Sequence, residues 1–444
     1  MSRVTFALFS LMAPMTVGAQ VLSSEFEERR QSVMSGSPDR LVLLTSNWDV
    51  KPDGQDGFRQ TPSFYYLTGL ENQIGAILLL DGPLRESTLF VPDDDPGVQL
   101  FNATVRSGDS TAQAMNLTRV LSISEFEPFF DSRNAEAQGL TVLVERQGPR
   151  APPVPGLGNF ADRGLALRDA LAARWPDLQL EALEGEIRLL RMIKSALEIE
   201  AIREAGRAAS QALLAGLTAL EPGKAQREVE VEMAAACFRA GADGVSWWPW
   251  AQTGPNAVFP YTLTSFADYR HLDREMGDGE LARLDVGCQY DHYQSDVGRT
   301  APVSGRWTAA QRETWDLLIT AYRTGLSAIR DGVSVDLVRS AFEEGVRLQE
   351  PGLQTELARE AAAIMLDRTR SPSWQIHGVG LEHGERVRQV LSQGMVIAFE
   401  PMFTVRSLGF YLEDLLLITE DGYELLTPDL PYTAQEIEEA MRRR

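Results

Sequence analysis

One stretch of the sequence, Leu281-Ala-Arg-Leu-Asp285-Val-Gly-Cys-Gln-Tyr-Asp-His-Tyr-Gln-Ser-Asp296-Val-Gly-Arg-Thr300, contains two short apolar, aromatic-rich runs around a polar turn. This pattern predicts a β-hairpin that carries one carboxylate on each arm, Asp285 and Asp296. A carboxylate in an apolar strand is costly to bury unless it is paired or binds a cation, so the two aspartates indicate a site for hard metal ions. Taken alone, the hairpin is explained equally well by two aspartates that flank an exposed turn.

A second pair of carboxylates lies in Gly394-Met-Val-Ile-Ala-Phe-Glu400-Pro-Met-Phe and Gly409-Phe-Tyr-Leu-Glu413-Asp-Leu-Leu-Leu-Ile-Thr. Four buried carboxylates close together repel one another strongly unless cations are present. Between the two pairs stands His377, one of only four histidines in the chain. A lone histidine is more often structural, but this context favours an imidazole ligand. The five side chains suffice for two bridged divalent ions, and their oxygen-rich chemistry favours Mn²⁺ over zinc alone.

Helical patterns precede each of these strand-rich segments. Ser195 and Glu198 fit a capping box that starts an amphipathic helix running to about Leu220. This helix breaks at Glu221-Pro222-Gly223, and a second helix follows from Glu228 to Ala240. The same pattern recurs as a helix from Thr308 to Ile329, a turn at Arg330-Asp331-Gly332 and a helix through Leu348. A helix, a glycine turn and a second helix thus occur twice, which predicts a duplicated half-domain.

The first part of the chain has a different pattern of short apolar runs and helical stretches. Buried strands are predicted at Leu41–Thr45, Gly75–Asp81, Ser87–Pro92 and Thr141–Glu145, with a helix from Ser122 to Phe130. These elements predict an α/β domain with a central sheet. A stretch rich in proline and glycine between Gln147 and Asn159 is typical of a domain linker.

Length and charge limit the classes of protein that fit. At 444 residues the chain is long enough for two domains. Its 42 basic and 63 acidic residues give a net charge of −21, which argues against nucleic acid and anionic lipid as partners. The charged end, Gln435 to Arg444, is typical of a solvated terminal helix.

The N-terminus has the features of a secretory signal peptide. Residues 1–19 contain a basic residue, an apolar run and the small-x-small ending Val17-Gly18-Ala19. We therefore predict cleavage after Ala19 and a periplasmic or secreted mature chain, with no membrane attachment. The sequence contains only two cysteines, Cys237 and Cys288, so no disulfide framework is expected, and packing is the expected role of Cys288.

The order Asp285, Asp296, His377, Glu400 and Glu413 resembles the ligand set of the pita-bread metallopeptidases. This family includes Xaa-Pro aminopeptidases, prolidases and methionine aminopeptidases. The motifs that carry the resemblance are Asp285-Val-Gly-Cys, Ser295-Asp-Val-Gly-Arg-Thr, His377-Gly-Val-Gly-Leu, Phe399-Glu-Pro and Leu412-Glu-Asp. Phe64-Tyr-Tyr-Leu-Thr-Gly and Arg191-Met-Ile-Lys-Ser-Ala-Leu-Glu198 are similar to segments of aminopeptidase P, whose N-terminal domain methionine aminopeptidases lack.

The resemblance implies an α+β pita-bread catalytic domain at residues 186–444, after an N-terminal α/β domain at 20–185. It also implies two divalent ions, with Mn²⁺ favoured over Co²⁺ and Zn²⁺, and peptide substrates with proline in the second position. Asp285 and Asp296 would bind one ion together, Asp296, Glu400 and Glu413 would be shared, and His377 would be terminal on the other ion. Glu400 would act as the general base. The resemblance leaves open the oligomeric state, including a homo-oligomer, and the restriction to dipeptides that defines a prolidase.

Auxiliary residues of the family are replaced in this chain. Tyr261 stands where typical members have a histidine, as does Ser373 before the ligand His377. Another histidine position falls on Gly384, with His383 one residue early, and an arginine position falls on Tyr411. Tyr261 and His383 are the expected substitute donors for substrate and oxyanion. The replacements also permit a non-catalytic, metal-bearing peptide-binding protein.

One aromatic segment, Trp247-Trp-Pro-Trp250, has two interpretations. Its indole rings could form a wall for a proline ring, yet large aromatic side chains more often belong to a core.

Overall fold

The computed structural model describes residues 17–47, 59–93, 105–136, 139, 141–145, 163–183, 185–258, 274–369 and 374–442. The chain divides into two compact units, Met1–Leu190 and Arg191–Arg444. Helix α1 (Val17–Gly36) includes the predicted cleavage position. The predicted linker between residues 147 and 159, Tyr261 and Ser373 lie outside the described residues.

The first unit is built on a six-stranded sheet in the order β4-β3-β2-β1-β5-β6. The four apolar runs predicted as strands are strands: β1 (Arg40–Thr45), β2 (Ile77–Asp81), β3 (Glu86–Val91) and β5 (Thr141–Glu145). The edge strands are β4 (Arg119–Ser122) and β6 (Gln179–Leu183), and the main helices that follow α1 are α2 (Pro62–Thr68), α4 (Asp109–Ala114), α5 (Phe126–Glu136) and α6 (Arg163–Arg174). Leu43, Leu79, Phe90 and Phe130 belong to the buried core of this unit.

The second unit contains a seven-stranded sheet whose main path runs β13-β14-β15-β12-β9-β8. Its strands are β8 (Trp250–Thr253), β9 (Leu281–Val286), β12 (Val297–Pro302), β13 (Trp374–Gly378), β14 (Val396–Val405) and β15 (Leu408–Ile418), with β16 (Tyr423–Leu425) paired to β15. In each half of the sheet, chain order runs from the edge strand to the centre, and β12 meets β15 in the middle. This mirrored arrangement fits the predicted duplication.

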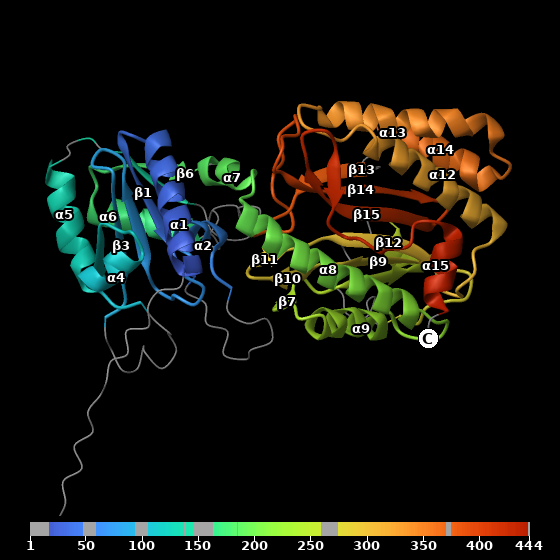
Figure 1. Ribbon diagram of the computed structural model, residues 1–444, viewed down its shortest axis with the longest axis horizontal. Coiled ribbons are helices and arrows are strands. Elements are labelled where there is room, and N and C mark those ends of the chain that lie inside the picture. Colours follow the sequence, from blue (N-terminus) through green and yellow to red (C-terminus); the bar gives the residue numbers. More distant parts are fainter. Residues whose placement is uncertain are drawn as a thin grey trace, which may run out of the picture. The chain divides into compact units, whose positions relative to one another are not determined.

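Each half of this sheet has its own layer of helices. In Figure 1, α8 (Ala196–Ala219) and α9 (Gln226–Arg239) lie along the strands of the first half, and α12 (Ala309–Leu326), α13 (Val335–Gln349) and α14 (Glu356–Leu366) along those of the second. The chain ends in α15 (Ala434–Met441). The predicted helix starts are correct to within a few residues because capping side chains set them, at Ser195 for α8 and Thr308 for α12. Within the described part of the chain, every helix is too short or too polar to span a lipid bilayer.

The first turn of α8 is tied to the carboxylate-bearing hairpin. Ser195 and Glu198 form the predicted capping box, in which the backbone N–H of Ser195 donates to Glu198 Oε2 at 2.9 Å. The other oxygen of Glu198 accepts from the hydroxyl of Tyr293 at 2.9 Å. Glu198 is buried and satisfied on both sides, so the helix start fixes the position of the hairpin turn.

The two cysteines form a disulfide, so the expectations of no disulfide framework and of a packing role for Cys288 were wrong. Cys237 in α9 is bonded to Cys288 in β10 (Cys288–Tyr290), with Cα atoms 5.6 Å apart and a sequence separation of 51. Counting cysteines could not reveal this pairing, because it requires α9 to pack over the hairpin. The bond fastens α9 to the segment that carries Asp285 and Asp296.

Loss of this disulfide is expected to destabilise the second unit by about 4 kcal/mol, the chain-entropy value for a loop of about 50 residues. Denaturant unfolding with and without dithiothreitol would measure the change. The variant Cys237→Ser/Cys288→Ser serves as the control, because its stability should not respond to the reductant. Alkylation of both thiols in the native, unreduced protein would show that the bond is absent.

Candidate metal centre

Three neighbouring strands place Asp285 and Glu413 on one face of the sheet. In the ladder, Gly298 of β12 pairs with Asp285 of β9 on one side and with Glu413 of β15 on the other. Side chains of directly paired residues project from the same face. Asp296 precedes Gly298 by two residues, so strand alternation directs it to that face as well. The three carboxylates are 5 %, 4 % and 0 % exposed for Asp285, Asp296 and Glu413.

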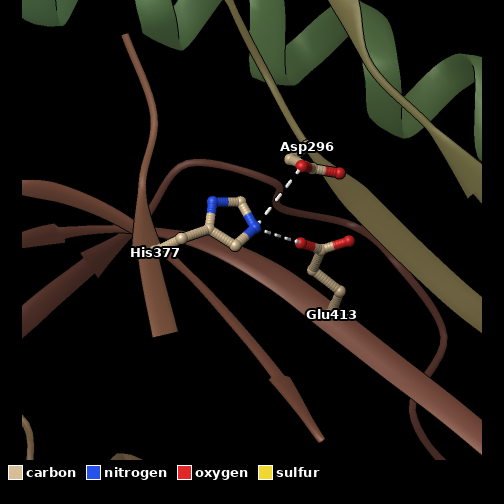
Figure 2. Close-up of side chains that lie close together, drawn as sticks. All are labelled: Asp296, His377 and Glu413. Atoms are coloured by element: carbon tan, nitrogen blue, oxygen red, sulfur yellow. Dashed lines mark ion pairs between the residues drawn. The ribbon is translucent and has the colours of Figure 1, made fainter. Parts of the chain in front are cut away.

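His377 reaches the same face from the edge strand β13. Its Nε2 atom lies 3.7 Å from Oδ2 of Asp296, 3.4 Å from Oε1 of Glu400 and 3.6 Å from Oε1 of Glu413. Figure 2 shows the imidazole nitrogen facing both Asp296 and Glu413. One imidazole nitrogen is thus shared by three carboxylates that come from β14, β15 and the residue before β12.

The second nitrogen of His377 is held by the backbone. Nδ1 lies 3.1 Å from the carbonyl oxygen of Gly378. When Nδ1 donates to this oxygen, the lone pair of Nε2 is directed at the carboxylates, which is the arrangement that orients a histidine ligand.

The buried oxygens of this cluster suit a divalent cation. Among the described side chains, Oδ1 of Asp285, Oδ1 of Asp296 and Oε1 of Glu413 are buried without a hydrogen-bond partner. Ligand atoms of Asp296, His377 and Glu413 lie within 4.8 Å of one another. Carboxylate oxygens with a single imidazole are the donor set of hard or borderline divalent ions, and the residues present therefore fit such ions.

The electrostatics of the cluster require positive charge. Burial and repulsion from Glu413 raise the pKa of Asp285 to about 8, and burial with the same neighbour raises the pKa of Asp296 well above its usual value. Burial and Glu413 also raise the pKa of Glu400. Without a cation the site holds protons instead, so metal binding must release them.

The pKa values of His377 and Glu413 are shifted in the directions that favour a protonated imidazole beside an ionised carboxylate. Burial opposes the charged form of His377, but its contacts with Glu400 and Glu413 outweigh burial and raise its pKa well above the usual value. Burial likewise opposes the charge on Glu413, yet His377 and Tyr411 lower the pKa of this carboxyl. A proton on His377 thus occupies the place that a cation would take.

The loop after β13 carries His383 and is anchored by buried charges. Glu385 accepts hydrogen bonds from Arg191 and from Lys194 Nζ, the latter at 2.9 Å. Burial raises the pKa of Glu385, but the two cations outweigh it and lower the pKa to about 2. The N–H of Gln294, two residues before Asp296, donates to the carbonyl of Gly380 at 2.7 Å. The loop is therefore fixed against the hairpin.

His383 itself is exposed and packs against Trp247, with ring centroids 4.7 Å apart. The ring of Trp247 also lies against Gly287, where an added Cβ would approach it to 2.7 Å. Trp247 thus borders the hairpin near Asp285, and His383 packs on Trp247. Gly384 lies in the same exposed turn. The positions of Tyr261 and Ser373 are outside the described residues, so the role predicted for Tyr261 stays a prediction.

Arg283 and Tyr411 complete the surroundings of the carboxylates. Arg283 was not among the residues predicted from the sequence, and Tyr411 was noted only as a departure from the family. Both are buried, with Arg283 6 % and Tyr411 1 % exposed. The signal was present in the sequence, because Arg283 stands two residues before Asp285 in an otherwise apolar strand and so shares its face.

Comparison with known proteins identifies the family. The model of metallopeptidase family M24 matches residues 200–420, and that of the aminopeptidase P N-terminal domain matches residues 26–143. The chain belongs to the pita-bread metallopeptidases of family M24. It is a hydrolytic metallo-aminopeptidase, and the predicted α+β pita-bread fold is confirmed.

Several relatives match nearly the whole chain. The Xaa-Pro aminopeptidase of Escherichia coli is 27 % identical over 95 % of this chain and 98 % of its own. The Xaa-Pro dipeptidase of Pyrococcus furiosus is 26 % identical over 88 % of this chain and 97 % of its own. A solved structure of E. coli aminopeptidase P with the inhibitor Pro-Leu superimposes with a TM-score of 0.73 at 25 % identity, covering 94 % of this chain and 98 % of that one.

Proposed function

We propose that this metallo-aminopeptidase removes the N-terminal residue from peptides that have proline in the second position, using two divalent ions, most simply Mn²⁺. The observation that carries the proposal is the cluster itself: His377 Nε2 lies within 3.7 Å of Asp296, Glu400 and Glu413. A relative from E. coli is named an Xaa-Pro aminopeptidase, and a solved structure of E. coli aminopeptidase P holds the inhibitor Pro-Leu.

Asp285, Asp296, His377, Glu400 and Glu413 are the residues that would hold the ions. When bound, the ions would lower the pKa of a water molecule and polarise the scissile carbonyl. Glu400 accepts the proton of this water as its oxygen attacks the carbonyl carbon, and it passes the proton to the nitrogen that leaves when the peptide bond breaks.

The residues around His383 supply candidate contacts with the substrate. The exposed imidazole of His383 can donate a hydrogen bond to the substrate or to the oxyanion, a contact that can be worth ~3 kcal/mol in the transition state. Trp247 offers an apolar ring face beside the hairpin, which suits a proline ring. Tyr261 is a second proposed donor.

A proline dipeptidase is the competing function, because the relative from P. furiosus is named an Xaa-Pro dipeptidase. A panel of Gly-Pro, Gly-Pro-Ala and Gly-Ala-Ala with Mn²⁺, Co²⁺ or Zn²⁺ separates the two. We expect the Mn²⁺-loaded enzyme to cleave Gly-Pro-Ala at least about tenfold faster than either other peptide, a difference of ~1.4 kcal/mol in activation free energy. Faster cleavage of Gly-Pro would favour the dipeptidase. No cleavage of any peptide would favour a binding protein.

We also propose that the mature chain is exported to the periplasm or secreted. Two features support export: the signal-like residues 1–19 and the disulfide between Cys237 and Cys288. Structural disulfides persist in oxidising compartments and are rare in the cytosol. N-terminal sequencing of the protein from the periplasmic fraction should begin at Gln20, and recovery of intact Met1 from the cytosol would contradict export.

A further inference from the structure

Arg283 is a buried cation within a strand whose six residues are all buried. Such a side chain is costly unless its charge is compensated. Its Nη2 atom lies 3.3 Å from Oδ2 of Asp285. Its guanidinium carbon lies 4.1 Å from the centroid of the Tyr411 ring, within cation–π range. Arg283 therefore links a predicted ligand on β9 to a tyrosine two strands away.

Tyr411 lies across the centre of the site. An added Cβ at Gly298 would collide with its ring, so the ring occupies the space between Asp285 and Glu413 that the glycine leaves free. The backbone N–H of Tyr411 donates to Thr300 Oγ1 at 2.8 Å, and its hydroxyl donates to Oε2 of Glu413. The ring is thus fixed at both its backbone and its hydroxyl.

These contacts divide the carboxylate oxygens into two sets. The oxygens that contact the pair are Oδ2 of Asp285, through Arg283, and Oε2 of Glu413, through Tyr411. The oxygens left without a hydrogen-bond partner are Oδ1 of Asp285 and Oε1 of Glu413. Oε1 of Glu413 is also the atom that faces Nε2 of His377, at 3.6 Å. The engaged oxygens belong to the pair, and the remaining ones are available to an ion.

We propose that Arg283 and Tyr411 form a positioning pair that orients the carboxylates of Asp285 and Glu413 toward the metal ions. Arg283 supplies from β9 the positive charge that an arginine at position 411 would supply from β15. The proposal rests on the proposed metal-dependent function of the site. Groups that hold ligands in this way typically change metal affinity or activity by 10- to 100-fold when removed.

The test measures Mn²⁺ binding by calorimetry in the absence of peptide. Arg283→Leu is expected to weaken binding of at least one ion by about 10- to 100-fold, and Tyr411→Phe, which removes only the hydroxyl, by about tenfold. The double variant Arg283→Leu/Tyr411→Arg moves the cation to β15 and should recover most of the affinity that Arg283→Leu loses. Arg306→Leu removes an exposed arginine just after β12 and should bind Mn²⁺ as the wild type does.

Several results would overturn the proposal: wild-type affinity in both single variants, no recovery in a folded double variant, or no Mn²⁺ binding by the wild type. Circular dichroism identifies any variant that fails to fold, and Tyr411→Phe then carries the test, because it keeps the ring that fills the space beside Gly298. Metal binding is measured without turnover. If the wild type binds two ions but cleaves no peptide, the proposed function is refuted, whereas the proposal that Arg283 and Tyr411 orient the ligands is not.

Discussion

Glu400→Gln is expected to reduce the turnover of a saturating Xaa-Pro-Yaa peptide by about 10³-fold, within the range that general-base groups contribute. Glutamine has nearly the same shape and keeps an oxygen that can face His377, 3.4 Å away in the wild type. It cannot accept the proton of the attacking water or return it to the leaving nitrogen. The loss should therefore appear in kcat, with KM little changed.

The matched control is Glu420→Gln, which makes the same chemical change at an exposed position beyond the end of β15. Its kcat should equal that of the wild type. Both variants are assayed at saturating Mn²⁺, with bound metal measured in the same samples, so that loss of a ligand is separated from loss of the base. Unchanged turnover by metal-loaded Glu400→Gln would remove Glu400 from the mechanism.

The second large effect concerns stability in the absence of metal. The metal-free protein is expected to lose stability as the pH rises from about 4 to about 8. The carboxyl of Asp285 has a pKa of about 8 when folded, against 3.8 as its ordinary value. Between these values the unfolded chain releases a proton that the folded chain keeps, so raising the pH favours unfolding. His377, whose pKa is also raised, acts in the same direction above its usual value.

Divalent ions should reverse this dependence, because they replace the protons and compensate the carboxylates. One ion present at a thousand times its dissociation constant adds ~4 kcal/mol, which corresponds to roughly 10 °C in Tm for a unit of this size. Thermal unfolding with EDTA or Mn²⁺ at pH 5 and pH 8 measures the shift. We expect the larger increase in Tm at pH 8. Equal shifts at the two pH values would contradict the predicted exchange of protons for metal.

Two substitutions of the same chemical kind calibrate this experiment. Asp285→Asn removes a buried carboxylate and should reduce both the pH dependence of the metal-free protein and its response to Mn²⁺. Asp291→Asn changes an exposed residue of the same hairpin that has a φ of 46°, a conformation that asparagine tolerates. The second variant should behave as the wild type.

Much of the site could be predicted because local patterns carry it. Asp285 and Asp296 occupy a predicted hairpin, and Glu400 and Glu413 lie in two apolar strand-like runs of the second half. A carboxylate in an apolar strand is costly to bury, so local sequence alone marks all four as candidate ligands. The helix start at Ser195 followed from capping chemistry, which needs only nearby residues. The position of His377 near both pairs of carboxylates depends on the register between separate strands, which local sequence does not show. The resemblance to a known family was the basis for predicting that His377 is a ligand.

Features that depend on packing between distant segments could not be predicted. The disulfide needs Cys237 of α9 above Cys288, and nothing in the spacing of two cysteines implies that contact. The contact between Arg283 and Tyr411 needs the order β9-β12-β15, with a glycine in the middle strand. Tyr411 was recognised as a departure from the family, but its compensation by Arg283 becomes visible only when the three strands are side by side.

The mirrored strand order implies a sequence of events in folding. Each hairpin, β9 with β12 and β14 with β15, joins residues that are close along the chain, whereas the pairing of Arg299 with Leu412 between β12 and β15 spans 113 residues. Such distant pairing is slow because a long loop must close first. The pairing of β12 with β15 also brings the carboxylates of the two halves close together, where they repel one another. We therefore expect the two halves to form early and to join late, with divalent ions accelerating the final joining step.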